Sequence, residues 1–239
     1  MIRYEVVPPE NIFRGLSYGQ WLAIWNNWLL SKNPDIYDGS QILFLRGNLD
    51  YTPPVESINY PRRINYSATY ERTGRKAIII FEETAIFVPI ITACYTIGTQ
   101  VDGKLLRTEH EARLQASKDI ELGSNMWLTI WKKGQKNPSK IVPKLTNFLT
   151  ESPLFKLVIP KNSLLNRKQY LPADKAGIFE AVSCAYCMII KSLHPSNYVI
   201  NFGGIGRGDY YTNSVYELQV QQKSYGTVRD ISSRKARRL

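Results

Sequence analysis

The chain has 239 residues, 44% of them hydrophobic and 21% charged, and its formal net charge is +11 at pH 7. These proportions describe an ordinary globular protein that is long enough to bury a core. No run reaches the roughly 18 apolar residues that a membrane-spanning helix needs, which excludes a helical span, and the positive charge favours an acidic partner: nucleic acid, an acidic protein surface or an anionic membrane face.

The first residues, MIRYEVVPPENIF, contain no basic region followed by a long apolar stretch. A secretory signal needs both, so we expect that the protein is not secreted through a signal peptide. Three cysteines without such a signal favour free thiols in a reducing compartment. We divide the chain into an N-terminal arm (residues 1–15), one domain (16–220) and a basic C-terminal tail (221–239).

A tryptophan-rich helix is predicted after the arm. Ser17 and Gln20 form a capping box of the S-x-x-Q type, which starts helices. The residues that follow recur at i, i+3, i+4 and i+7 and share one helical face: Trp21, Ile24, Trp25 and Trp28. Asn26 and Asn27 are expected on the other side, and Asn33-Pro34 is expected to end the helix.

The three tryptophans of this helix allow more than one role. Core packing is favoured, because each indole ring buries a large area and its N–H needs a single partner. A stacking site for a sugar or a base is the alternative. A helix that lies on a membrane would carry Lys or Arg on its polar face, and residues 18–31 contain neither. We therefore interpret Trp21, Trp25 and Trp28 as a structural anchor.

Runs rich in β-branched and aromatic residues predict strands along the rest of the chain. They cover residues 41–47, 76–81, 85–97, 125–131, 153–160, 178–193, 198–202 and 214–221. Glu82-Glu83 is expected in a turn or bulge, and Asp102-Gly103 is a strong hairpin signal. Thr108 and Glu111 form a second capping box for a short helix to about residue 120, and residues 132–152 are expected as a loop.

This order of elements predicts the fold class. Eight or more strands at short spacing, with helices only as insertions, are typical of an all-β sandwich or barrel. We expect a mainly β protein: a single β-sandwich or jelly-roll-like domain with one N-terminal Trp-rich amphipathic helix and a second short helix.

Little in the sequence points to catalysis. Cys184 and Cys187 form a C-x-x-C pair, but residues i and i+3 of a strand point to opposite faces, so the two sulfurs should not converge; they would share a side only if the segment were helical. His110 and His194 are the only histidines, too few for a three-histidine metal site, and both are expected at the surface. We therefore expect no catalytic, cofactor-binding or metal site.

Two further patterns are weak signals for chemistry. The stretch GGIGRGD at residues 203–209 has the glycines of a phosphate-binding loop but neither G-K-[ST] nor a following helix, so a hairpin loop is favoured. No G-x-S-x-G elbow is present to supply a serine nucleophile. An enzyme that uses carboxylates such as Asp35, Asp38 or Glu82 is the least favoured hypothesis for the function of this protein.

The C-terminal tail is the sharpest electrostatic feature of the sequence. Against Asp230 alone it carries six cations: Lys223, Arg229, Arg234, Lys235, Arg237 and Arg238. Such a segment either keeps the protein soluble as a disordered end or binds an acidic protein surface or nucleic acid.

Several motifs resemble those of an uncharacterised, mostly secreted bacterial family that carries a G-x-S-x-x-E-W-x-x-x-W-W-x-W helix and then an F-L-x-G strand. The similar stretches, in order, are Ser17 to Trp21 with Trp25 and Trp28, Phe44-Leu45-x-Gly47, Thr84 to Ile90, Ser152-Pro153-x-Phe155, Leu193-His194-Pro195, and Val215-Tyr216-x-Leu218-x-Val220. The resemblance implies one all-β domain and supplies no activity. The chain departs from the family pattern where Asn26 replaces an indole and where the secretion signal is missing.

A jelly-roll-like, basic domain with arms also resembles, by architecture only, the minor capsid or penton proteins of large icosahedral DNA viruses. That resemblance implies a virion location, synthesis in the host cytoplasm, and other capsid or assembly proteins as partners, with a homo-oligomer expected. Our leading hypothesis is a structural, non-enzymatic subunit of such an assembly, held to its neighbours by its arms. The alternative is a carbohydrate-type ligand-binding β-sandwich module that uses Trp and Tyr side chains.

Overall fold

The computed structural model describes residues 4–31, 41–46, 77–121, 123–135, 139–140, 145–161, 163, 176–205 and 211–223. Within these ranges the chain is mainly β with two α-helices, as the sequence predicts. The helices are α1 (Tyr18–Leu30) and α3 (Glu109–Glu121), with the short 3-10 helix η1 (Leu145–Phe148). The strands are β1 (Glu5–Val6), β2 (Ile42–Phe44), β3 (Ile78–Phe81), β4 (Ala85–Thr96), β5 (Gln100–Val101), β6 (Lys104–Leu105), β7 (Ser124–Lys132), β8 (Ser139–Lys140), β9 (Leu149–Glu151), β10 (Phe155–Ile159), β11 (Gly177–Lys191), β12 (Ser196–Ile205) and β13 (Tyr211–Gln221).

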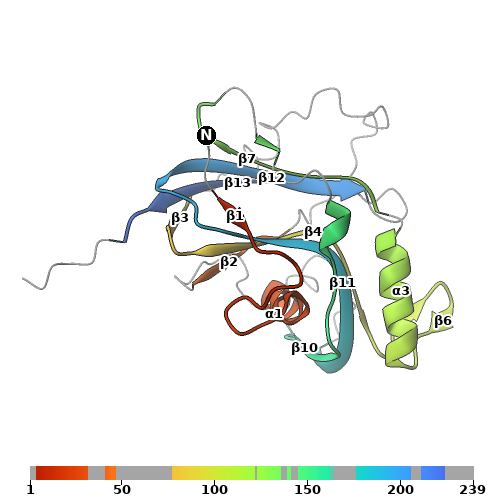
Figure 1. Cartoon of the computed structure of the whole chain (residues 1–239). Coiled ribbons are helices and arrows are strands. Elements are labelled where there is room, and N and C mark those ends of the chain that lie inside the picture. Colours follow the sequence, from red (N-terminus) through yellow and green to blue (C-terminus); the bar gives the residue numbers. More distant parts are fainter. Residues whose placement is uncertain are drawn as a thin grey trace, which may run out of the picture.

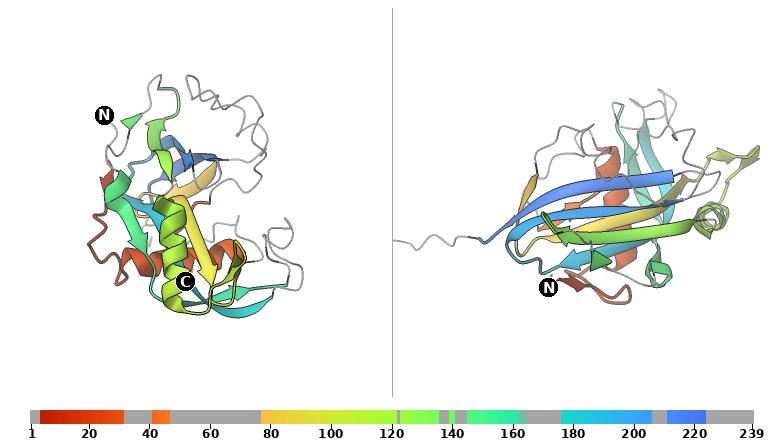
Figure 2. Two further views of the ribbon diagram at one scale, coloured as in Figure 1. Left: turned by 90° about the vertical axis from the view of Figure 1, so that its right-hand side faces the viewer. Right: turned by 90° about the horizontal axis from the view of Figure 1, so that it is seen from above.

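The strands form two main sheets and a small β5–β6 hairpin. The six-stranded inner sheet runs from β1, β9 and β10, which share one edge of β11, through β11 and β4 to β2. The five-stranded outer sheet has the order β3-β13-β12-β7-β8. Figure 1 shows the inner sheet between α1 and the outer sheet, and Figure 2 shows β13, β12 and β7 side by side. The result is a β-sandwich-like core with a helix on one face. Two pairings, β13 with β3 and β2 with β4, are parallel, whereas jelly rolls are antiparallel.

Strand β11 explains the layering. Its even-numbered residues, such as Cys184, Met188 and Ile190, belong to the apolar cluster between the two sheets. Its odd-numbered residues Ala185, Cys187 and Ile189 belong to the cluster under α1. Because both faces are covered, the strand is a nearly continuous apolar run rather than an alternating one.

Helix α3 lies beside the two sheets and covers the end of the core between them (Figure 1). Ala116 and Ile120 join the intersheet cluster, and Ala112 packs with Leu106 and Val182. The predicted T-x-x-E capping box is present: Glu111 N–H donates to Thr108 Oγ1 at 3.2 Å, and Thr108 N–H donates to Glu111 Oε2 at 3.2 Å. Neither of the two described α-helices, each of 13 residues, is long and apolar enough to cross a membrane.

Helix α1 starts at the predicted capping box, in which Ser17 and Gln20 exchange hydrogen bonds. Its buried face differs from the prediction. Ile24 is 40% exposed, whereas Asn26 is buried and donates to Leu22 O at 2.9 Å. The helix is rotated because Tyr18, Leu22 and Trp25, rather than the whole tryptophan row, face the inner sheet. It ends at Leu30, and Asn33-Pro34 lies outside the described residues.

Gly19 lets α1 approach the inner sheet closely. A Cβ atom at this position would lie 2.2 Å from the carbonyl oxygen of Glu151 in β9. Any side chain would therefore push the helix away from the strand. The glycine that precedes the tryptophan row is thus explained by packing.

The described part of the predicted N-terminal arm belongs to the domain. β1 pairs with the end of β11, and Val7 N–H donates to Ile189 O at 3.0 Å. The buried Tyr18 hydroxyl donates to Val7 O at 2.6 Å and accepts from Ile189 N–H at 3.0 Å. Burial of this hydroxyl raises its pKa above the ordinary value. Within the predicted N-terminal arm, residues 5–7 are thus held against β11, in part through Tyr18.

Two other segments differ from the sequence prediction. Residues 132–152, expected as a loop, contain β8, η1 and β9, and β9 pairs with β11. These elements are short and lack a period that would reveal them. The expected β12–β13 hairpin is confirmed by their antiparallel pairing, but Gly203 and Gly204 lie within β12. A Cβ on Gly204 would lie 2.7 Å from Ile91 Cδ1, so a larger residue there would require the Ile91 side chain to shift.

Candidate functional site

Trp21 and Trp25 of α1 use their indole N–H groups inside the fold, and Trp28 contributes a ring contact. Trp25 is 3% exposed and its Nε1 donates to Leu45 O at 2.7 Å. Trp21 Nε1 donates to Phe13 O at 3.0 Å. The rings of Trp21 and Trp28 lie on Phe44, at centroid distances of 6.2 and 5.6 Å. Such satisfied, interlocked indoles fix α1 and β2 together rather than offering a free face to a ligand.

The C-x-x-C pair is held apart by the sheet. Cys184 belongs to the intersheet cluster and Cys187 to the cluster under α1, so the two side chains lie on opposite faces of β11. Burial raises the pKa of Cys184 to about 11 and that of Cys187 to about 12. Neither thiol is therefore activated as a nucleophile at neutral pH.

The remaining titratable candidates are scattered. His110 and His194 are exposed, on α3 and after β11 respectively, and Glu82 lies in the turn between β3 and β4. Asp35 and Asp38 lie outside the described residues. In the part of the chain that the structure describes, no group of three His, Cys, Asp or Glu side chains could hold a metal ion.

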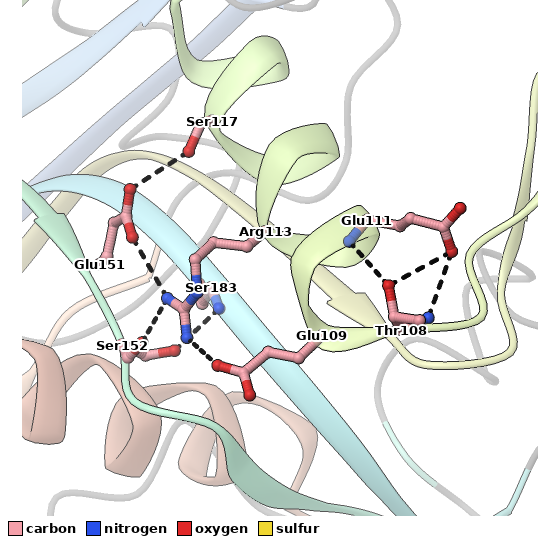
Figure 3. Close-up of polar contacts among 8 residues, drawn as sticks. All are labelled: Thr108, Glu109, Glu111, Arg113, Ser117, Glu151, Ser152 and Ser183. Atoms are coloured by element: carbon pink, nitrogen blue, oxygen red, sulfur yellow. Dashed lines mark hydrogen bonds and ion pairs between the residues drawn. The ribbon is translucent and has the colours of Figure 1, made fainter.

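One polar cluster was not predicted, and it joins α3 to the inner sheet (Figure 3). Arg113 Nη2 pairs with Glu109 Oε1 at 2.6 Å, and Arg113 Nη1 donates to Glu151 Oε2 at 3.2 Å and to Ser152 O at 2.8 Å. Ser117 Oγ donates to the other oxygen of Glu151 at 3.3 Å. The hydrogen bond with Glu109 is the main reason that the pKa of Arg113 is raised.

The serine in this cluster is not poised for catalysis. Ser152 is buried, its Oγ accepts from Ser183 N–H at 2.8 Å, and its own N–H donates to Ser183 O at 2.8 Å. The hydroxyl therefore completes the β11 ladder where β9 ends. The cluster acts as a structural clamp. Glu109 and Arg113 have a local i, i+4 spacing, but Glu151 and Ser152 lie too far from Arg113 in sequence for a local motif to reveal them.

The root of the basic tail lies at the β3–β4 turn. Lys223 Nζ pairs with Glu83 Oε1 at 2.9 Å, and this contact lowers the pKa of the Glu83 carboxyl. Arg14 Nη2 donates to Glu83 O at 2.9 Å. Of the six predicted tail cations only Lys223 is described; Arg229, Arg234, Lys235, Arg237 and Arg238 lie outside the described residues.

Strand β3 presents apolar side chains beside this root. Its register pairs Phe81 with Gln221, the last residue of β13. Ile80 is fully buried in the intersheet cluster, whereas Ile79 is 52% exposed and Phe81 is 37% exposed. An edge strand with exposed apolar side chains is a template on which another strand can pair. Sequence analysis found the strand, but the exposure follows from its place at the edge.

The outward face of the outer sheet carries a small amide network. Trp127 Nε1 donates to Asn201 Oδ1 at 2.5 Å, and Asn201 Nδ2 donates to Asn213 Oδ1 at 2.8 Å. Asn201 is fully buried. Its polar atoms are thus used to hold Trp127 against β12.

Comparisons with protein-family models, with curated proteins and with solved structures found no match to this chain. The resemblances to the bacterial family and to viral capsid proteins therefore remain predictions.

Proposed function

We propose that this protein is a structural, non-enzymatic subunit of a larger assembly, of the minor capsid or penton kind found in large icosahedral DNA viruses. In such an assembly it would be made in the host cytoplasm and reside in the virion. Its neighbours would be other capsid proteins and further copies of the chain. The C-terminal tail, rather than the packed N-terminal segment, is the arm that reaches them.

The observation that carries this proposal is the position of the tail root. Lys223 pairs with Glu83 at the end of the outer sheet, and the sequence places five further cations after it, within residues 224–239. Next to this point β3 exposes Ile79 and Phe81. A basic segment beside an apolar edge offers steering and a contact surface together.

The test compares incorporation of the full-length protein and of a variant lacking residues 224–239 into the parent particle, over a series of salt concentrations. We expect the truncated protein to be incorporated less at physiological salt, and the difference to shrink as salt screens the charges. A matched control replaces the five cations with glutamine at unchanged length. Equal incorporation of all three proteins at every salt concentration would refute the proposal.

The alternative, a carbohydrate-binding module, depends on an aromatic side chain at the surface. Trp127 favours it, because this indole lies on the outward face of the outer sheet and is held by Asn201. Titration of oligosaccharides against tryptophan fluorescence tests it, with Trp127→Phe as the comparison. Saturable binding by the native protein that Trp127→Phe weakens would replace the assembly proposal with this one.

A further inference from the structure

We propose that the outer edge of β3 is a docking site for an extended, acidic segment of a partner protein, which adds a strand to the outer sheet. This inference rests on the proposed assembly function and names the chemistry of the partner. It is carried by the outward N–H groups of Ile79 and Phe81, which no described strand pairs, by the exposed side chains of β3 and by the positive charge of the tail that follows β13.

The main chain of β3 is paired on one side. β13 lies parallel to it from Leu218↔Ile78 to Gln221↔Phe81, and among the described strands none pairs with its other side. Glu82 N–H donates to Gln221 O at 3.0 Å. Because the direction of the N–H groups alternates along a strand, those of Ile79 and Phe81 point to the outer edge. A partner strand can accept hydrogen bonds from both.

The side chains of β3 add a contact surface to this edge. Ile79 and Phe81 are two positions apart and share the outward face, where both are exposed. Natural edge strands usually carry a charge, a proline or a bulge that prevents pairing, and the sequence of β3, IIIF, has none of them. Alternate apolar side chains of an added strand would pack on these two residues.

Charge selects the kind of partner. Lys223 pairs with Glu83 and Arg14 contacts the same turn, so these two cations offset the two carboxylates of the turn, and the excess positive charge comes from residues 224–239, which hold five cations and Asp230. Glu82 is the one further carboxylate of the turn. A second copy of the chain would bring another net +11 to the interface, so repulsion disfavours self-pairing and attraction favours an acidic strand.

The test uses an acidic peptide of alternating Val and Glu, about twelve residues long, and a peptide in which Lys replaces Glu. Binding is followed by calorimetry, and amide hydrogen exchange is followed residue by residue with NMR. We expect the acidic peptide alone to bind and to slow exchange at Ile79 and Phe81. Equal binding of the Lys peptide, protection at other residues, or no binding would overturn the inference. Protection of these two amides in the free protein would do the same, because the edge would already be occupied.

Two matched substitutions separate main-chain pairing from side-chain contact. Ile79→Pro removes the outward N–H, and Ile79→Thr keeps it while removing apolar surface. Proline is tolerated on edge strands, and an unchanged melting curve checks the fold. We expect Ile79→Pro to weaken peptide binding about tenfold or more and Ile79→Thr by less. Equal loss with both would contradict strand addition.

The same variants distinguish failure of this inference from failure of the proposed function. If incorporation into the particle depends on the tail but not on Ile79→Pro, the edge inference fails and the assembly proposal stands. If the peptide binds as expected but incorporation ignores the tail, the assembly proposal fails on its own.

Discussion

An edge strand of the inner sheet and an edge strand of the outer sheet differ in whether a side chain covers their main chain. On the inner sheet, the outer edge of β10 is covered by a side chain of α1: Asn27 Oδ1 accepts from Val158 N–H at 2.9 Å, and Asn27 Nδ2 donates to Lys156 O at 3.1 Å. A carboxamide with this geometry reproduces the two hydrogen bonds of a neighbouring strand. On the outer sheet, β3 has no such cover among the described residues.

This difference separates stability from interaction. On the inner sheet both faces of β11 are packed and Asn27 covers the outer edge of β10, although Leu149, Val158 and Ile178 remain exposed. The outer sheet buries one face against the inner sheet, and its edge strand β3 leaves Ile79 and Phe81 exposed. Asn27 thus prevents further strand pairing at β10, whereas no residue in the described part of the chain does so at β3.

The largest expected effect comes from the helix that covers the inner sheet. Trp25→Ala removes a buried ring and its hydrogen bond to Leu45, and it should cost about 3–5 kcal/mol of unfolding free energy. Trp127→Ala, on the outward face of the outer sheet, is the matched control and should cost less than half as much. Urea unfolding of both variants measures this. Equal losses of unfolding free energy in the two variants would show that Trp127 contributes as much to stability as Trp25.

The second prediction uses the thiols on the two faces of β11. Burial raises the pKa of Cys184 to about 11 and that of Cys187 to about 12, above the ordinary value of 9.0. The thiols are protonated in both states below pH 9, and the folded state loses stability as the pH rises from 9 through 11 to 12, because the unfolded thiols ionise first. At pH 8 a thiol reagent should label neither in the native protein and both in denaturant.

Trp25→Ala sharpens the same measurement. It loosens the α1 face alone, so Cys187 should become reactive before Cys184. Mass spectrometry of the labelled peptides identifies the order. Simultaneous labelling of both cysteines would mean that the variant opens globally and that the two faces are one cooperative unit.

A smaller effect is expected when the closed edge is opened. Asn27→Ala removes two hydrogen bonds to β10 and should cost about 1–2 kcal/mol. Asn27→Asp keeps the acceptor for Val158 N–H but loses the donor to Lys156 O, so it should lie between Asn27→Ala and the native protein. Asn27→Ala should also associate with rising concentration in sedimentation experiments. If Asn27→Ala remained a monomer of unchanged stability, Asn27 would not be the residue that prevents pairing at the edge of β10.

Sequence reasoning succeeded where the determinants are local. The capping boxes at Ser17 and Thr108 place the helix starts, and Asp102-Gly103 places a hairpin in which both residues have positive φ, 50° and 78°. The rotation of α1 could not be read in this way. The orientation of the helix depends on the hydrogen bond between Tyr18 and Ile189, which is 171 positions away. The apolar spacing alone predicts that Ile24 is as buried as the tryptophans.

The side-chain contacts that sequence analysis missed join residues that are distant in the chain. Asn27 lies 131 positions from Val158, and Arg113 lies 38 positions from Glu151. An asparagine on a polar helix face and an arginine in a charged helix are unremarkable in sequence. The edge position of β3 also depends on strand order, which the parallel β13–β3 pairing sets and the alternation of residues does not encode.

The smallest effect on stability is expected from the tail, which follows β13 of the outer sheet. Residues 224–239 lack apolar periodicity, and their removal leaves the Lys223–Glu83 pair in place. The unfolding free energy should therefore change by well under about 1 kcal/mol.

Binding should change much more: with duplex DNA and all six tail cations engaged, the slope of log K against log salt would approach about −5. An acidic protein strand at β3 should give a shallower slope and a fixed stoichiometry, since its apolar contacts with Ile79 and Phe81 do not depend on salt. A steep slope that Ile79→Pro leaves unchanged would assign the tail to nucleic acid and leave the β3 edge without a part in binding.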